Sequence, residues 1–138
     1  MPVYSVELPA GALTREQKQE LAAAIPDVHQ KVTGAAPDLV NVFFYEIDAA
    51  DRYLAGKQGA MTPVIRCHIR VGKSDLEHRA LTSALNDEWN RITGGARADL
   101  IATVEAWQAR TTMEAGRFLP EHGDEEEWLS ATRGANTR

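Results

Sequence analysis

The chain has 138 residues, of which 43% are hydrophobic and 25% are charged, and these proportions are typical of one globular domain. Fifteen basic and twenty acidic side chains give a formal net charge of −5, and this acidic balance without basic runs argues against nucleic-acid or membrane-surface partners. Cys67 is the only cysteine, which excludes an internal disulfide and a zinc site built from cysteines.

The first part of the chain predicts a strand, a helix and a second strand. Alternating apolar and polar residues from Val3 to Leu8 indicate a strand. A capping box that begins at Thr14 predicts a helix with one apolar face, which ends at Gly34. Val40 to Ile47 is rich in β-branched and aromatic residues and predicts the next strand.

The same pattern recurs about sixty positions later, where Val32-Thr33-Gly34 is matched by Ile92-Thr93-Gly94. Val64 to Val71 predicts a strand, Ser74 to Thr93 a capped helix, and Leu100 to Trp107 a final strand. A βαβ unit has parallel strands and a right-handed crossover. Two fused βαβ units therefore predict an α+β fold, in which a four-stranded sheet carries two helices on one face.

We expect a single domain with pseudo-repeats over about residues 2–60 and 62–109, followed by a polar tail over residues 110–138. The last residues of this tail, 130–138, are expected to fray. The sheet face opposite the helices is expected to carry Phe43, Phe44, Tyr45 and Ile65. Because so large an exposed apolar patch favours aggregation, other subunits are expected to cover it.

Two cations near the second helix predict a site for an anion. Arg70 ends a strand, and Lys73 directly precedes the cap of the helix that begins after Ser74. A helix N-terminus offers free backbone N–H donors and a positive partial charge. The combination favours a small ligand that bears a carboxylate.

Pro2 is a candidate proton carrier, because removal of Met1 would expose a secondary amine. The pKa of an α-amino group is about 8, so burial or a neighbouring cation brings it toward neutrality. The structural alternative is that a proline merely begins an edge strand, where no N–H donor is needed. If Met1 stays attached, the Pro2 nitrogen is a tertiary amide and carries no proton.

These features together resemble the tautomerase superfamily. A duplicated βαβ unit begins with Pro2 directly after Met1, and Gly116-Arg117-Phe118-Leu119-Pro120 is preceded by Glu114. This segment, followed by Glu127-Trp128, is similar to the cis-3-chloroacrylic acid dehalogenase group. The resemblance implies a homotrimer that uses an amino-terminal proline as its catalytic group and needs no cofactor.

The resemblance also implies roles for individual residues. Pro2 would transfer protons, Glu114 would activate water, His29 would donate a hydrogen bond to a substrate oxygen, and Arg70 would hold the substrate carboxylate. Arg117 is expected on the substrate side as well, although it could equally pair with Glu114. A packed histidine at the edge of the core is the alternative for His29, since the equivalent residue of the second unit is a tryptophan.

Two positions depart from the pattern of the dehalogenase group. Lys73 stands where the group has a second arginine, and Thr103 stands where it has a tyrosine. Lysine keeps the charge but loses the planar, two-pronged grip on a carboxylate, and threonine lacks the reach of a phenol. Both residues are still expected to contact the substrate, with a looser hold on it.

The sequence thus predicts a cofactor-independent tautomerase that moves protons on small keto, enol or unsaturated carboxylates. A cis-3-haloacrylate dehalogenase or hydratase is the alternative enzyme, and a non-catalytic ligand-binding trimer with Met1 retained is the alternative of another class. No metal site is expected, because His68 and His78 lack carboxylates at ligand spacing. No apolar run approaches the ~20 residues of a membrane span and no signal peptide is visible, so we expect a cytoplasmic protein without membrane partners.

Overall fold

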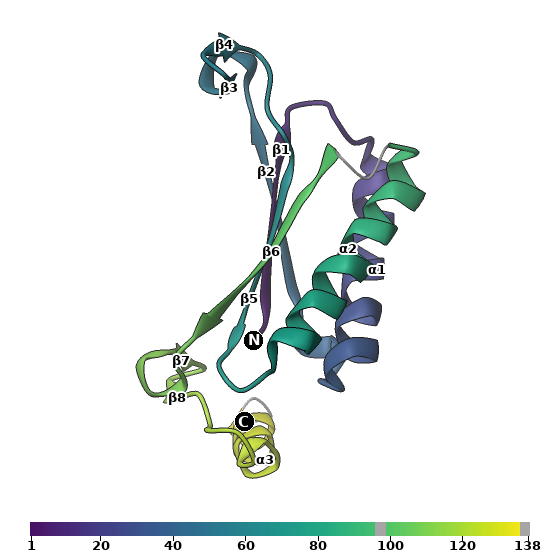
Figure 1. The fold of residues 1–138 in the computed structure, drawn as a ribbon. Helices are drawn as coiled ribbons and strands as arrows, with labels where there is room; N and C mark the ends of the chain where they lie inside the picture. Colours follow the sequence, from purple (N-terminus) through teal and green to yellow (C-terminus); the bar gives the residue numbers. More distant parts are fainter. Residues whose placement is uncertain (96–98, 136–138) are drawn as a thin grey trace.

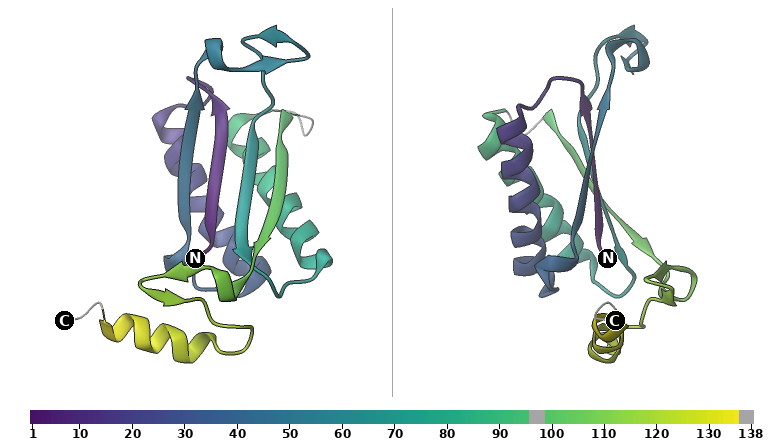
Figure 2. Two further views of the ribbon diagram at one scale, coloured as in Figure 1. Left: turned by 90° about the vertical axis from the view of Figure 1, so that its left-hand side faces the viewer. Right: turned by 180° about the vertical axis from the view of Figure 1, so that it is seen from behind.

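The computed structural model describes residues 1–95 and 99–135, and its centre is a two-layer arrangement of one sheet and two helices. Figure 1 shows both helices against the same face of the sheet, and Figure 2 shows the four strands side by side. The sheet has the order β2-β1-β5-β6. Its strands are β1 (Val3–Pro9), β2 (Asn41–Ile47), β5 (Val64–Arg70) and β6 (Ile101–Trp107).

The strand pairing shows two βαβ units joined through their first strands. β1 pairs in parallel with β2, and β5 pairs in parallel with β6, while β1 and β5 run antiparallel to each other. The crossover helices are α1 (Arg15–Thr33) and α2 (Asp75–Thr93). The fold class predicted from the sequence is confirmed.

Both crossover helices begin and end with the caps that the sequence predicts. The Thr14 hydroxyl accepts from the Gln17 N–H, and Ser74 and Glu77 form the same capping box at the start of α2. Gly34 closes α1 with a φ of 73°, and this left-handed conformation is the one that glycine adopts without a steric cost. Local chemistry therefore sets the length of both helices.

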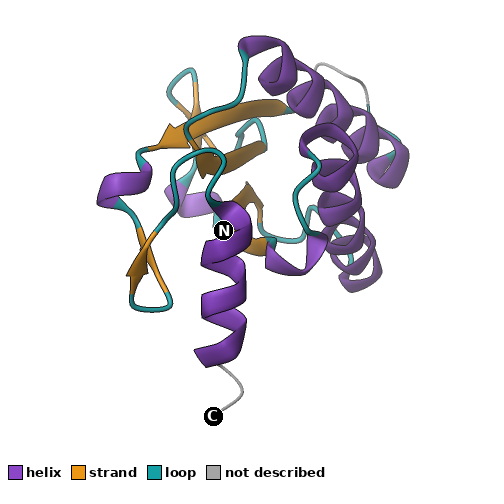
Figure 3. Cartoon of the chain, turned by 90° about the horizontal axis from the view of Figure 1, so that it is seen from below, coloured by secondary structure: helices purple, strands orange, loops and turns teal. Residues whose placement is uncertain are grey.

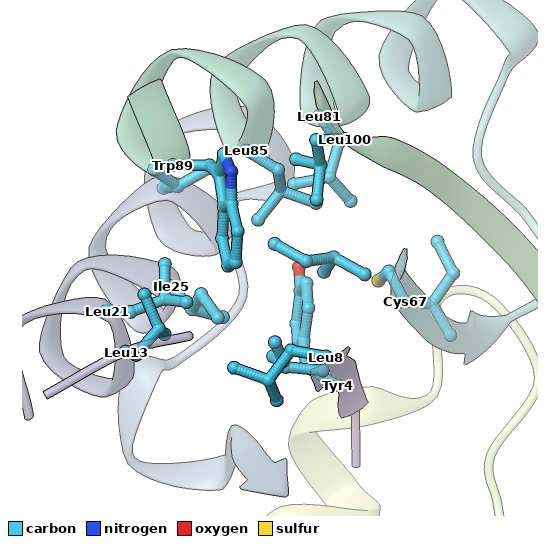
Figure 4. Packing of buried hydrophobic residues seen from close by; sticks show 14 residues of the cluster. Tyr4, Leu8, Leu13, Leu21, Ile25, Cys67, Leu81, Leu85, Trp89 and Leu100 are labelled. Atoms are coloured by element: carbon cyan, nitrogen blue, oxygen red, sulfur yellow. The ribbon is translucent and has the colours of Figure 1, made fainter. Parts of the chain in front are cut away.

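The core lies between the sheet and the two helices, as Figure 4 shows. Its fully buried members come from alternate positions of β1 and β5 and from the inner faces of the helices: Tyr4, Val6, Leu8, Leu21, Ile25, Ile65, Cys67 and Leu85. The expectation for the uncovered sheet face is half right. Phe43 and Tyr45 are exposed there, at 48% and 52%, whereas Phe44 and Ile65 pack into the core. Adjacent strand residues point to opposite faces, so the four could not share one face.

Each unit ends in a short 3-10 helix and a two-stranded hairpin. The first unit has η2 (Ala49–Asp51), β3 (Tyr53–Leu54) and β4 (Lys57–Gln58), and the second has η4 (Ala109–Thr111), β7 (Met113–Glu114) and β8 (Arg117–Phe118). Both hairpins turn through an alanine at φ 51° followed by a glycine. The two hairpins lie at opposite ends of the sheet (Figure 1).

The C-terminal segment forms a helix, α3 (Glu125–Ala135), so the expectation of fraying from residue 130 is wrong as far as residue 135. Residues 136–138 lie outside the described part of the chain. Trp128 anchors α3, because its side chain is buried with Ala109 and Leu119 and its Nε1–H donates to the Phe118 carbonyl at 2.8 Å. None of the described helices is both long and apolar enough to cross a bilayer.

Candidate functional site

A cavity of about 450 Å³ lies at the end of the sheet where the chain begins. Seen from below in Figure 3, α3 lies in front of the N-terminus, and Met1 packs against the cluster that contains Trp128 of α3. The cavity is lined from four directions, by the start of β1, the C-terminal end of α1, the β5–α2 connection and the C-terminal segment. Its polar and charged lining groups are the Met1 amine, His29, Thr33, Arg70, Lys73, Glu114 and Glu125.

The amino terminus is held at this cavity by a carboxylate from the second hairpin. The Met1 ammonium donates to both carboxylate oxygens of Glu114, at 2.8 and 2.9 Å. Pro2 is buried and also lines the cavity. Glu114 ends β7, directly before the turn of the second hairpin, in which Ala115 has a positive φ. An amine and a carboxylate thus meet at the cavity wall.

His29 is buried on α1 and bonded to a tyrosine of the core. Its Nδ1 lies 2.7 Å from the Tyr4 hydroxyl, and the two rings meet edge to face. Burial, helped by the positive charges of Lys73 and the amino terminus, lowers the pKa of His29 from 6.5 to about 4. The imidazole is therefore neutral at pH 7, and when Tyr4 donates to Nδ1 its one proton sits on Nε2.

The two cations of the cavity have unequal surroundings. Arg70 donates to the backbone carbonyls of Pro120 and Glu121 and to the carboxylate of Glu125. Lys73 donates to the Thr33 carbonyl at 3.1 Å, at the C-terminal end of α1. Arg70 is thus tied to the C-terminal segment, whereas Lys73 is held by a neutral carbonyl.

Glu125 is charged at neutral pH. Partial desolvation raises its pKa, but hydrogen bonds from Arg70 and from the backbone N–H groups of Glu125 and Gly123 outweigh it, and the pKa falls to about 2. The Glu125 carboxylate therefore stays on Arg70 across the physiological pH range. It keeps the start of α3 beside the cavity.

The structure brings together five of the seven residues expected at the site, namely Pro2, His29, Arg70, Lys73 and Glu114. Thr103 and Arg117 are not part of the described lining. Thr103 lies in the middle of β6 opposite Arg66, on the uncovered sheet face. Arg117 pairs with Glu114 across the hairpin ladder, but its side chain is exposed.

Two further side chains, Glu125 and Trp128, line the cavity and a third, Tyr4, bonds to His29, and the sequence patterns assign none of them a role there. Tyr4 looked like one of several alternating core residues, and only the fold places its hydroxyl on His29. Glu125 stood in an acidic run with nothing to distinguish it from its neighbours. Trp128 belongs to the segment that is similar to the dehalogenase group. Its packing beside the cavity depends on Leu119, which lies outside α3 and which the pattern of the helix alone does not include.

The chain contains an internal comparison for Pro2. Pro2 precedes β1 and its carbonyl accepts from the Asn41 N–H at 3.1 Å; Pro63 precedes β5 and its carbonyl accepts from the Ile101 N–H at 2.9 Å. The two prolines thus occupy equivalent places in the two units. Only Pro2 adjoins a chain terminus.

The polar groups near Pro2 have apolar counterparts in the other unit. His29 corresponds to Trp89, which is buried in the core, and Glu114 corresponds to Leu54, sixty positions earlier in the first hairpin. The places equivalent to His29 and Glu114 thus hold apolar side chains. The two units therefore differ at these positions, with polar side chains near Pro2 and apolar side chains in the equivalent places.

A protein-family model and several solved structures match the chain along most of its length. A family model named Tautomerase_3, described as "Putative oxalocrotonate tautomerase enzyme", matches residues 1–133. No curated protein matches the chain. No group of three or more His, Cys, Asp or Glu side chains suited to a metal ion occurs within residues 1–95 and 99–135.

Solved structures with the same fold include three of particular relevance. Native Ps01740 is 30% identical, with a TM-score of 0.76, over 81% of this chain and 99% of its own. A native fused 4-OT is 25% identical, with a TM-score of 0.77, over 84% of this chain and 94% of its own. N1, a member of the cis-3-chloroacrylic acid dehalogenase family, is 24% identical, with a TM-score of 0.83 over 99% of both chains, and at that identity it supports the fold alone.

Proposed function

Because the chain belongs to this oxalocrotonate tautomerase family, we propose that it interconverts the keto and enol forms of small carboxylates with the Pro2 amine as proton carrier. The observation that carries the proposal is the meeting of the amino terminus with Glu114, His29, Arg70 and Lys73 at one cavity. Removal of Met1 is a requirement, because a peptide-bonded proline nitrogen has neither a proton nor a free lone pair.

Each group has a part in the proposed proton transfer. The Pro2 amine carries a proton between the carbon and the oxygen of the enol, so that no proton is gained or lost overall. Neutral His29 donates from Nε2 to the substrate oxygen, where negative charge develops. Lys73 binds the substrate carboxylate, and Arg70, which is paired with Glu125, lines the same cavity. Thr33 and the apolar lining complete the enclosure.

A homotrimer is the proposed assembly. Several neighbours of the same fold are fused 4-OT trimers, and exposed Phe43 and Tyr45 on the uncovered sheet face of this chain need cover. Thr103 lies on that face, away from the cavity of its own chain, so it would contact a substrate held by a neighbouring subunit.

Hydration or dehalogenation of a 3-haloacrylate is the second candidate. It is favoured by Glu114, whose carboxylate lies at the same cavity as the amine and is suited to activate a water. The protonated Pro2 would supply a proton to C2 while Glu114 takes a proton from the water that attacks C3. The resulting 3-halo-3-hydroxy acid would then lose its halide and the hydroxyl proton to give the 3-oxo acid. Lys73 and Thr103 make the hold on the substrate looser than in the dehalogenase pattern, so this activity should be the weaker one.

The test begins with mass spectrometry of the intact protein, which should show that Met1 is absent. Pro2→Ala should then lower the rate of enol–keto conversion of phenylpyruvate at least ~100-fold, as expected for loss of a positioned acid or base. Pro63→Ala is the matched control, because Pro63 holds the equivalent place in the other unit, and its activity should stay close to wild type. Equal activity of Pro2→Ala and wild type would remove Pro2 from the mechanism, and faster turnover of cis-3-chloroacrylate than of the enol would reverse the order of the two candidates.

A further inference from the structure

We propose that Glu125 makes this cavity selective for ligands with a single carboxylate, because it occupies the Arg70 guanidinium that would otherwise receive a second one. The inference rests on the proposed function in that it concerns the same cavity and the carboxylate class of its ligand. It adds a residue that sets specificity and an upper limit on the charge of the ligand.

The charges of the cavity pair off almost completely. Among the described lining residues, three cationic groups face two carboxylates. The terminal amine is paired with Glu114, and Arg70 is paired with Glu125. Loss of Met1 would not change this balance, since the new terminus also carries one amine. One positive charge, that of Lys73, is left to meet an incoming anion.

Lys73 is suited to receive that anion. Its ammonium has three donors, and the structure gives it one short contact, to the Thr33 carbonyl. The carboxylate of Glu77 lies 4.0 Å away, at the limit of an ion pair, and is itself bonded to the backbone N–H and hydroxyl of Ser74. A ligand carboxylate can therefore bind Lys73 without displacing another strong partner.

Arg70, in contrast, cannot receive a ligand carboxylate without losing a partner. Its guanidinium already donates to two backbone carbonyls and to the Glu125 carboxylate. A second ligand carboxylate would have to displace Glu125, whose charge persists at neutral pH, or lie next to it. Two carboxylates side by side repel each other, and displacement of Glu125 would break its ion pair with Arg70. A dicarboxylate should therefore bind less well than the monocarboxylate of the same shape.

The rest of the lining indicates what the remainder of the ligand is like. Leu119, Trp128 and Leu129 form an apolar wall on the side of the C-terminal segment, and Leu39 and Ile69 also line the cavity. A cavity of about 450 Å³ holds more than a three-carbon acid. The ligand class is thus a monocarboxylate with an apolar substituent.

Binding of unreactive probes by calorimetry tests the inference without any catalytic step. 3-Phenylpropionate and phenylsuccinate differ only by a second carboxylate on C3, and propionate lacks the ring. The wild-type protein should bind 3-phenylpropionate at least about tenfold more tightly than either of the other two. Glu125→Gln frees Arg70 and should shift the preference toward phenylsuccinate by about tenfold or more. Glu126→Gln is the matched control, an exposed carboxylate in the same helical turn, and it should keep the wild-type ratio.

Several outcomes would overturn the inference. They are equal binding of the two phenyl probes to the wild type, no binding of any probe, or the same ratio in Glu125→Gln as in wild type. Should Glu125→Gln fail to fold, Lys73→Met decides, because loss of the receiving cation should weaken 3-phenylpropionate at least about tenfold, and a change below twofold would contradict the assignment. Probe binding as expected in a protein without tautomerase turnover would refute the proposed function alone.

Discussion

Replacing His29 by asparagine should remove a pH dependence of stability that the wild-type protein has between pH 4 and 6.5. The pKa of His29 is about 4 in the folded protein and 6.5 when exposed, so in this range the unfolded chain binds a proton that the folded chain does not. The free energy of unfolding therefore falls as the pH drops through 6.5 and stops falling, for this group, near pH 4. The full loss is roughly 3 kcal/mol, at 1.36 kcal/mol per unit of pKa difference.

Asparagine suits this test because its side-chain oxygen can accept from the Tyr4 hydroxyl much as Nδ1 of the histidine does. The substitution loses some packing, which lowers the free energy of unfolding equally at every pH. The titration of His29 therefore appears as the difference between wild type and variant in how this free energy changes with pH. Between pH 7 and pH 5 the wild type should lose about 2 kcal/mol more than His29→Asn in urea unfolding at one fixed protein concentration. His122→Asn is the control, since the same substitution is made at a histidine whose side chain is 63% exposed.

Parallel pH profiles for wild type and His29→Asn would refute the reasoning. They would mean that His29 takes up its proton in the folded state as easily as in the unfolded chain.

Two further predictions concern the second hairpin and the segment after it. Trp128→Ala should release α3, because it removes the buried side chain and the Nε1 hydrogen bond to Phe118; a Trp→Ala change in a core costs about 3–5 kcal/mol. Hydrogen exchange should then rise at residues 125–135 but not in β1 or α1, and unchanged exchange in α3 would count against this anchor. Ala115→Gly should raise the free energy of unfolding by up to about 1 kcal/mol, because alanine is strained at a φ of 51°. Ala55→Gly is the paired test in the first hairpin, and a lower melting temperature in both variants would contradict the strain.

Much of the fold was predictable because its signals are local. The strands alternate over two residues, and the helices are bounded by capping boxes and left-handed glycines that lie within a few residues of each boundary. The helix in the C-terminal tail could not be predicted from local signals of this kind. Most of its residues are polar, and α3 is stabilised by one tryptophan that packs against Ala109 and Leu119, so its order depends on contacts that no short window shows.

The candidate site also has some residues that the sequence reveals and others that only the fold reveals. Arg70 and Lys73 are predictable from their place beside a helix start and Pro2 from its place after Met1, whereas Glu114 rests on the family resemblance. The role of Glu125 was not accessible, because an ion pair across 55 residues exists only once β5 and the C-terminal segment meet. The sequence does carry one further signal. The two Ala-Gly turns align Leu54 with Glu114, and this alignment marks Glu114 as a polar residue in a place that is apolar in the first hairpin.

The second proline gives the duplicated fold a fixed asymmetry. Pro63 is placed before β5 as Pro2 is placed before β1, yet its nitrogen lies inside the chain as a tertiary amide. No substitution of neighbouring side chains can turn that nitrogen into an amine, because a polypeptide has only one amino terminus. Joining two units in one chain thus leaves a single terminal amine per pair, and the places equivalent to His29 and Glu114 hold Trp89 and Leu54.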